Sequence, residues 1–121
     1  MIEGLLGLGL VGLAAVPRFS RDRKLALYRS VNNLGLVMVS SMESNGDTVV
    51  WLYEAENPSA RPHDRRPNRY AGHVGKGRSG DRAMALFGAM RGAVHHIGQE
   101  RLQRTLNRRQ LEVLARAMRS A

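Results

Sequence analysis

The spacing of apolar residues changes along the chain, and the changes predict a mixed α+β fold. Apolar side chains recur every three residues from Leu25 to Leu34, which favours one face of a short helix. Ser20 precedes this stretch as a candidate N-cap, and Gly35 follows it as a stop signal. A strand beginning within residues 24–31 is the alternative that the pattern leaves open.

A β-hairpin is the clearest prediction. Residues 34–42 and 48–55 are rich in strand-forming residues, and Asn45-Gly46 between them is typical of a two-residue type I′ turn. Such a turn pairs Ser40 with Trp51, and Met38 with Tyr53. Both faces of this hairpin are largely apolar, so we expect helices on one face and a neighbouring surface on the other. Trp51 and Tyr53 are then expected in the core.

The C-terminal third predicts amphipathic helices. Apolar residues spaced three and four apart run from Ala83 to Ile97 behind the candidate cap Asp81. Two shorter helical stretches follow, and Asn107 is the candidate cap of the second, with Gln110 as its capping-box partner. Gly88 and Gly92 form a G-x-x-x-G pair, a spacing that predicts helix packing because small residues let another backbone approach closely.

The N-terminus is an apolar segment whose only charge is Glu3. As a helix, residues 2–16 would span roughly 22 Å, less than the ~30 Å hydrocarbon core of a bilayer. The segment lacks a basic n-region, so no cleaved signal peptide is expected, and the arginines after Pro17 favour a cytoplasmic C-terminal side. We expect an anchor in a membrane or, alternatively, in a hydrophobic protein partner, made by Leu5, Leu6, Leu8, Leu10, Val11 and Leu13.

Residues 57–81 are rich in proline, glycine and arginine, a composition that predicts an extended linker. Gly75 to Gly80 match G-x-G-x-x-G, but a linker stands where a dinucleotide site needs a buried strand. Four parts are therefore predicted: an anchor at 1–17, a helix and hairpin at 18–56, the linker at 57–81, and a basic helical region at 82–121.

Positive charge is concentrated in the second half of the chain. The protein has 19 Lys and Arg against 10 Asp and Glu, and residues 57–121 hold fourteen of the basic side chains but four of the acidic ones. This imbalance indicates an anionic partner, such as nucleic acid, acidic lipid or an acidic protein surface, although solvated surface charge is the alternative. The candidate anion-binding residues are Arg61, Arg65, Arg66, Arg69, Lys76 and Arg78.

Catalytic chemistry has little support in the sequence. The chain has no cysteine, and its four histidines form no metal-binding pattern. No nucleophile, base and orienting group can be assigned, so we expect no metal and no cofactor. The sequence predicts a non-enzymatic structural or accessory component of a larger homo- or hetero-oligomeric assembly, such as a membrane complex or a virion. A small sequence-independent nucleic-acid-binding protein and an enzyme with an unrecognised site are the alternatives.

Overall fold

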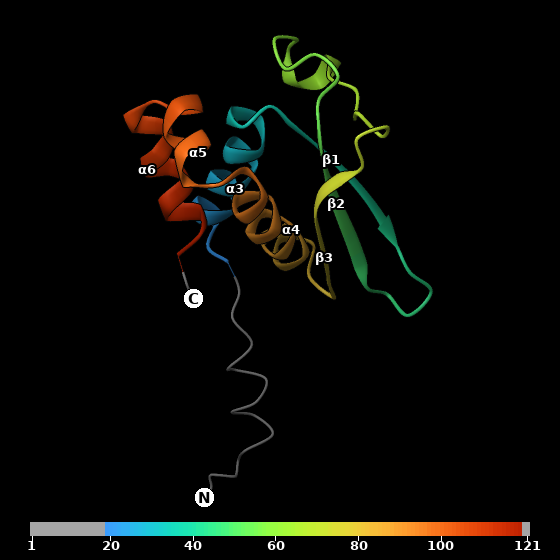
Figure 1. Ribbon diagram of the computed structural model, residues 1–121. Helices are drawn as coiled ribbons and strands as arrows, with labels where there is room; N and C mark the ends of the chain where they lie inside the picture. Colours follow the sequence, from blue (N-terminus) through green and yellow to red (C-terminus); the bar gives the residue numbers. More distant parts are fainter. Residues whose placement is uncertain (1–18, 120–121) are drawn as a thin grey trace, which may run out of the picture.

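In the part of the chain that the structure describes, the helices lie on one side of a three-stranded antiparallel sheet (Figure 1). The computed structural model describes residues 19–119, so the expected N-terminal anchor helix at 1–17 lies outside the described residues. The mixed α+β class is confirmed. In chain order the elements are α3 (Arg21–Asn33), β1 (Leu36–Met42), β2 (Thr48–Glu54), the 3₁₀ turn η1 (Pro62–Asp64), β3 (His73–Ser79), α4 (Arg82–Ile97), α5 (Gln99–Thr105) and α6 (Arg108–Ala117).

The predicted helix starts are confirmed by their caps. The Ser20 side chain accepts a hydrogen bond from the backbone N–H of Arg23 at the start of α3. Asp81 caps α4, and Asn107 forms a capping box with Gln110 at the start of α6. Each cap satisfies N–H groups that a helix leaves unpaired at its first turn. Within residues 19–119, no helix combines the length and the apolar character needed to cross a membrane.

The hairpin is confirmed, but its turn differs from the predicted two-residue type I′ turn. The backbone N–H of Gly46 donates to the carbonyl of Glu43 at 2.9 Å, and the N–H of Glu43 donates to the carbonyl of Asp47 at 2.8 Å. Gly46 has a φ of 91°. This is a three-residue loop, in which an i to i+3 turn is followed by a residue in the left-handed region. Asn45 and Gly46 therefore occupy the third and fourth positions of the turn, instead of the predicted second and third.

The longer loop shifts the strand register by one residue. Ser40 lies opposite Val50 and Val39 lies opposite Trp51, whereas the predicted pairing placed Ser40 opposite Trp51. Because side chains alternate between faces, this shift changes which residues of the two strands share a face.

The expected linker at 57–81 contains the third strand of the sheet, so this prediction is wrong for residues 73–79. Strand β3 pairs antiparallel with β2, with Gly75 opposite Leu52 and Gly77 opposite Val50. The strand carries cations on one face and glycines on the other, so it shows none of the apolar alternation by which a strand is recognised. Residues 57–72 form a loop held to the sheet by a bridge between Ala55 and Pro67.

Helix α4 packs directly on the glycine side of β3. A Cβ atom added at Gly75 would lie 2.0 Å from the carbonyl oxygen of Ala89, and one added at Gly77 would lie 2.0 Å from that of Ala85. Both positions therefore require the absence of a side chain.

On the helix side, a Cβ added at Gly88 would lie 3.5 Å from the Cα of Gly77, and one added at Gly92 would lie 3.3 Å from the Cα of Gly75. The backbone that approaches the G-x-x-x-G pair thus belongs to a strand.

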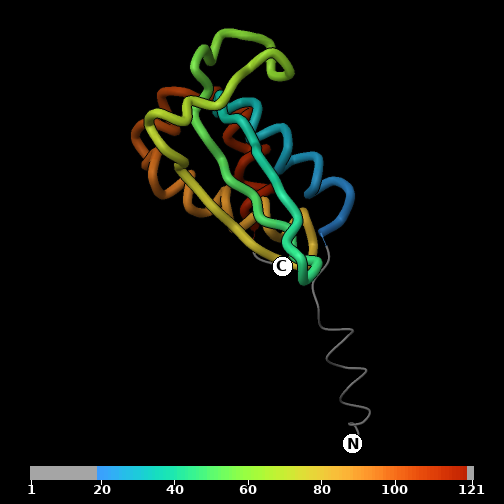
Figure 2. The backbone as a smooth tube through the Cα atoms, turned by 90° about the vertical axis from the view of Figure 1, so that its right-hand side faces the viewer, coloured from blue at the N-terminus to red at the C-terminus, as the bar shows by residue number. Residues whose placement is uncertain are grey.

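The core lies between the sheet and the helix layer, which Figure 2 shows behind the strands. Leu52 and Leu86 are fully buried there, and Leu27 of α3 and Leu114 of α6 belong to the same cluster. Residues from the predicted parts 18–56 and 82–121 therefore share one hydrophobic core.

We predict that Gly77→Ala lowers the free energy of unfolding by about 3 kcal/mol or more, because its methyl group overlaps the backbone of α4. Gly80→Ala is the matched control, since its Cβ would meet only the Asp47 side chain, at 3.8 Å. Chemical denaturation of both variants measures the difference. Equal unfolding midpoints for the two variants would contradict the close packing.

Candidate nucleic-acid interface

The face of the sheet that points away from the helices carries a mixture of apolar, aromatic and basic side chains. We call this surface the open face, and among the described residues no helix covers it (Figure 2). Trp51 and Tyr53 of β2 lie at its centre, half-buried and outside the hydrophobic core cluster, so their predicted core placement is wrong. The open face consists of Val37, Val39, Ser41, Val49, Trp51, Tyr53, His73, Lys76 and Arg78.

Each aromatic ring of the open face has a cation over it. The Nζ atom of Lys76 lies 5.8 Å from the centroid of the Trp51 ring, and the guanidinium carbon of Arg69 lies 5.3 Å from that of Tyr53. His73 packs edge-on against Tyr53. Both cations are on exposed residues, and within residues 19–119 neither makes an ion pair. Their charges are therefore available to an anionic partner.

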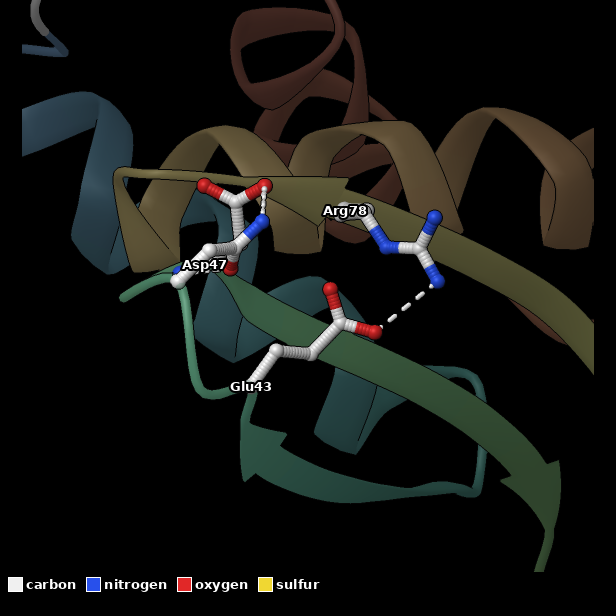
Figure 3. A network of polar contacts seen from close by, with 4 residues as sticks. Glu43, Asp47 and Arg78 are labelled. Carbon is white, nitrogen blue, oxygen red and sulfur yellow. Dashed lines mark hydrogen bonds and ion pairs between the residues drawn. The ribbon is translucent and has the colours of Figure 1, made fainter.

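Arg78, at the other end of β3, already has a carboxylate partner. Its guanidinium lies 3.0 Å from the carboxylate of Glu43 in the hairpin loop, near Asp47 (Figure 3). This ion pair connects β3 to the hairpin loop. Val49, the residue of β2 that lies opposite Arg78, is only 2% exposed. Of the predicted anion-binding residues, Arg78 is thus the one that is internally neutralised by an acidic side chain.

Arg65 has a structural role in the loop. Its side chain donates to the carbonyl oxygens of Ala60, Asn32 and Pro58 at 3.0, 2.8 and 3.0 Å. These bonds hold the loop against the C-terminal end of α3, and they occupy all three guanidinium nitrogens. Arg66, by contrast, is exposed.

The six predicted anion-binding residues therefore divide into three groups. Arg69 and Lys76 lie over the open face, and Arg61 and Arg66 lie exposed on the adjacent loop. Arg65 and Arg78 are engaged within the protein. Sequence reasoning missed the exposure of Trp51 and Tyr53. Recognising residues 73–79 as a third strand, with its cations on the outward face, would have indicated this exposure.

Like Arg65 and Arg78, Arg23 of α3 is engaged within the protein. Its side chain donates to the backbone carbonyls of Ala117 and Arg119 at the end of α6. Its guanidinium lies 4.2 Å from the ring centroid of Phe19. Cations at a helix C-terminus are favourable because carbonyl groups there are unpaired. Arg23 thus joins the first and last described helices.

A cavity of about 530 Å³ opens beside Phe19, the first described residue. It is lined by Phe19, Met84, Phe87, Arg91, Val94, His95 and Met118. Among residues 19–119, no cluster of three or more metal-ligating side chains occurs here or elsewhere. The cavity lining combines apolar side chains with the polar side chains of Arg91 and His95.

No protein-family model matches the chain, and no curated protein and no solved structure matches it. Functional inference therefore depends on the geometry of the described residues.

We predict that Arg65→Gln lowers the unfolding midpoint, because three backbone carbonyls lose a charged donor, at a cost of about 1–3 kcal/mol. Arg66→Gln removes the same charge from the neighbouring position and should leave the midpoint unchanged. Thermal unfolding of the two variants is the measurement. A similar shift in both would mean that the hydrogen bonds of Arg65 do not stabilise the loop.

Proposed function

We propose that this protein is a non-enzymatic binding protein that contacts single-stranded nucleic acid through the open face, without sequence preference. The observation that carries the proposal is the pair of half-buried rings, Trp51 and Tyr53, on the middle strand, each beside a solvent-exposed cation.

The spacing of the two rings suits adjacent bases. Trp51 and Tyr53 are two residues apart on one face of a strand, so their attachment points are about 6.8 Å apart. Stacking of one base on an aromatic side chain contributes roughly 1–3 kcal/mol, and every base offers a flat π face. A base that stacks here displaces a cation–π contact worth about 0.5–1 kcal/mol at an exposed site. Stacking therefore remains favourable.

The cations around the rings supply contacts to phosphate. The bases displace Lys76 and Arg69 from the rings, and the long side chains of these two residues can then reach the phosphate groups of the nucleic acid. Arg66 and Arg61 continue the positive charge along the loop. Contacts to phosphate and stacking on rings carry no base code, so we infer binding that tolerates any sequence.

We predict that a single-stranded oligonucleotide quenches the fluorescence of Trp51, the sole tryptophan. Replacing Tyr53 by Leu should weaken binding about tenfold or more, through the loss of one stacked base. Replacing Arg61, Arg66 and Arg69 together by Gln should flatten the dependence of log affinity on log salt by about 0.7 for each lost phosphate contact.

The matched control removes the same charge from the helix layer, with Arg104, Arg108 and Arg109 changed to Gln. This variant should keep the salt dependence of the parent protein. Equal salt slopes for the loop and helix variants would contradict binding at the open face. Binding to anionic liposomes without binding to nucleic acid would contradict the choice of partner.

A second candidate function is that of an anchored component of a larger assembly, such as a membrane complex or virion. Two observations favour it: the apolar run at residues 2–16 precedes Phe19 in the sequence, and Phe19 lines a cavity together with Met84 and Phe87 of α4. The segment would hold the protein to a membrane or to a hydrophobic protein partner, with the basic body on the cytoplasmic side. The two functions are compatible, because the open face and the cavity use different residues.

We predict that deletion of residues 1–16 moves the protein from the membrane or complex fraction of a native extract into the supernatant. The deletion leaves Phe19 and all of the described core in place. Fractionation of the full-length and truncated chains is the measurement, and nucleic-acid binding by the truncated chain is the control for folding. Identical partitioning of the two chains would contradict anchoring.

A further inference from the structure

The two edges of the sheet differ in charge. Strand β3 forms one edge, and it carries Lys76 and Arg78 and an irregularity opposite Leu52 and Tyr53. Charged side chains and bulges are the features by which proteins prevent unwanted pairing at an edge strand. Strand β1 forms the other edge, and its seven residues, Leu-Val-Met-Val-Ser-Ser-Met, include no charge and no proline. Only β1 is suited to pairing with another strand.

The outward backbone groups of β1 follow from the hairpin register. The backbone N–H of Glu43 donates to the carbonyl of Asp47, and the N–H of Ala55 donates to the carbonyl of Gly35. The odd-numbered residues of β1 therefore direct their backbone groups toward β2. The even-numbered residues therefore direct their N–H and C=O groups outward. Met38, Ser40 and Met42 present these groups along the free edge.

Exposed apolar side chains gather on the elements at this edge. Four large hydrophobic residues among the described ones are exposed, and three of them belong to β1 or α3: Met42 at 75%, Leu25 at 45% and Tyr28 at 37%. Helix α3 lies alongside β1 (Figure 2). An interface along β1 would thus bring further apolar surface near the contact.

Charge also favours this edge for contact between two copies. The chain has a net charge of +9, yet it contains no Lys or Arg between Arg29 and Arg61. The same stretch contains Glu43, Asp47, Glu54 and Glu56. Strand β1 and the hairpin loop therefore contribute no basic side chain of their own to a contact between two copies, which limits the repulsion between them.

We propose that β1 pairs with β1 of a second copy of this chain, antiparallel about a two-fold axis, to form a continuous six-stranded sheet. With the axis at Val39, all seven residues of each strand are paired, and Leu36 lies opposite Met42 of the other copy. The two open faces then join into one surface. The dimer itself stands apart from the proposed function, but the use of the joined surface for nucleic acid rests on it.

The first test compares two proline variants of the full-length chain by sedimentation in mild detergent, which masks the apolar N-terminus. Ser40→Pro removes an outward N–H from the edge and leaves the bonds to β2 intact. Ser44→Pro is the matched control, since it lies in the hairpin loop at a turn position that accepts proline. We expect a dimer for the parent and for Ser44→Pro, and half that mass for Ser40→Pro, with unchanged circular dichroism.

The second test uses the absence of cysteine from the chain. With the axis at Val39, that residue faces its own copy at a position where the strands are not hydrogen-bonded, and such pairs lie close enough for a disulfide. Val39→Cys should therefore form a covalent dimer on oxidation, and combining it with Ser40→Pro should abolish that product. Ser44→Cys is the control that should remain monomeric in a denaturing gel.

Two outcomes overturn the dimer: a monomeric parent at every concentration, or equal masses for the two proline variants. Nucleic-acid binding separates this result from the proposed function. If the dimer forms and its nucleotide site size equals that of Ser40→Pro, the joined surface is wrong. If the dimer forms and neither protein binds nucleic acid, the proposed function fails and the dimer stands.

Discussion

The close contact between the backbones of α4 and β3 is the constraint on which the rest of the fold depends. The carbonyl oxygens of Ala85 and Ala89 lie where Cβ atoms at Gly77 and Gly75 would be, so the helix can lie this near only because the strand has no side chains on that face. This contact joins the second half of the chain to the hairpin. It also places Leu86 and Met90 against the sheet, where both are fully buried.

The same contact determines what the other face of the sheet presents. Because side chains alternate along a strand, a β3 with glycines toward α4 must direct Lys76 and its other intervening residues outward. The register then sets Lys76 beside Trp51. A packing requirement inside the protein and a cationic, aromatic surface outside it are thus two faces of one short sequence, Gly-Lys-Gly-Arg.

Local signals in the sequence predicted the helices and the hairpin, because caps and turn residues act over a few positions. Ser20, Asp81 and Asn107 were identified as caps in this way. Strand β3 could not be predicted from local signals, because it packs against the backbone of a helix and pairs with a strand that is distant in the sequence. Its glycines also give no apolar alternation from which a strand could be recognised. Missing β3 led to a linker at 57–81 and hid the exposure of Trp51. The hydrogen bonds of Arg65 and Arg78 could not be predicted either, because they include partners 33 and 35 positions away in the sequence, beyond the reach of any local pattern.

The loop at Gly46 determines more than the shape of a turn. Most surface loops can change with little effect on the core, because their residues add little to it. Here the strands on both sides are largely apolar, so the same sequence also fits a two-residue Asn-Gly turn, with β1 slid by one position against β2. That slip would carry Met38 out of the core side and bring Val37 or Val39 into it. The three-residue form of the loop therefore decides which side chains of β1 enter the core and which remain on the open face.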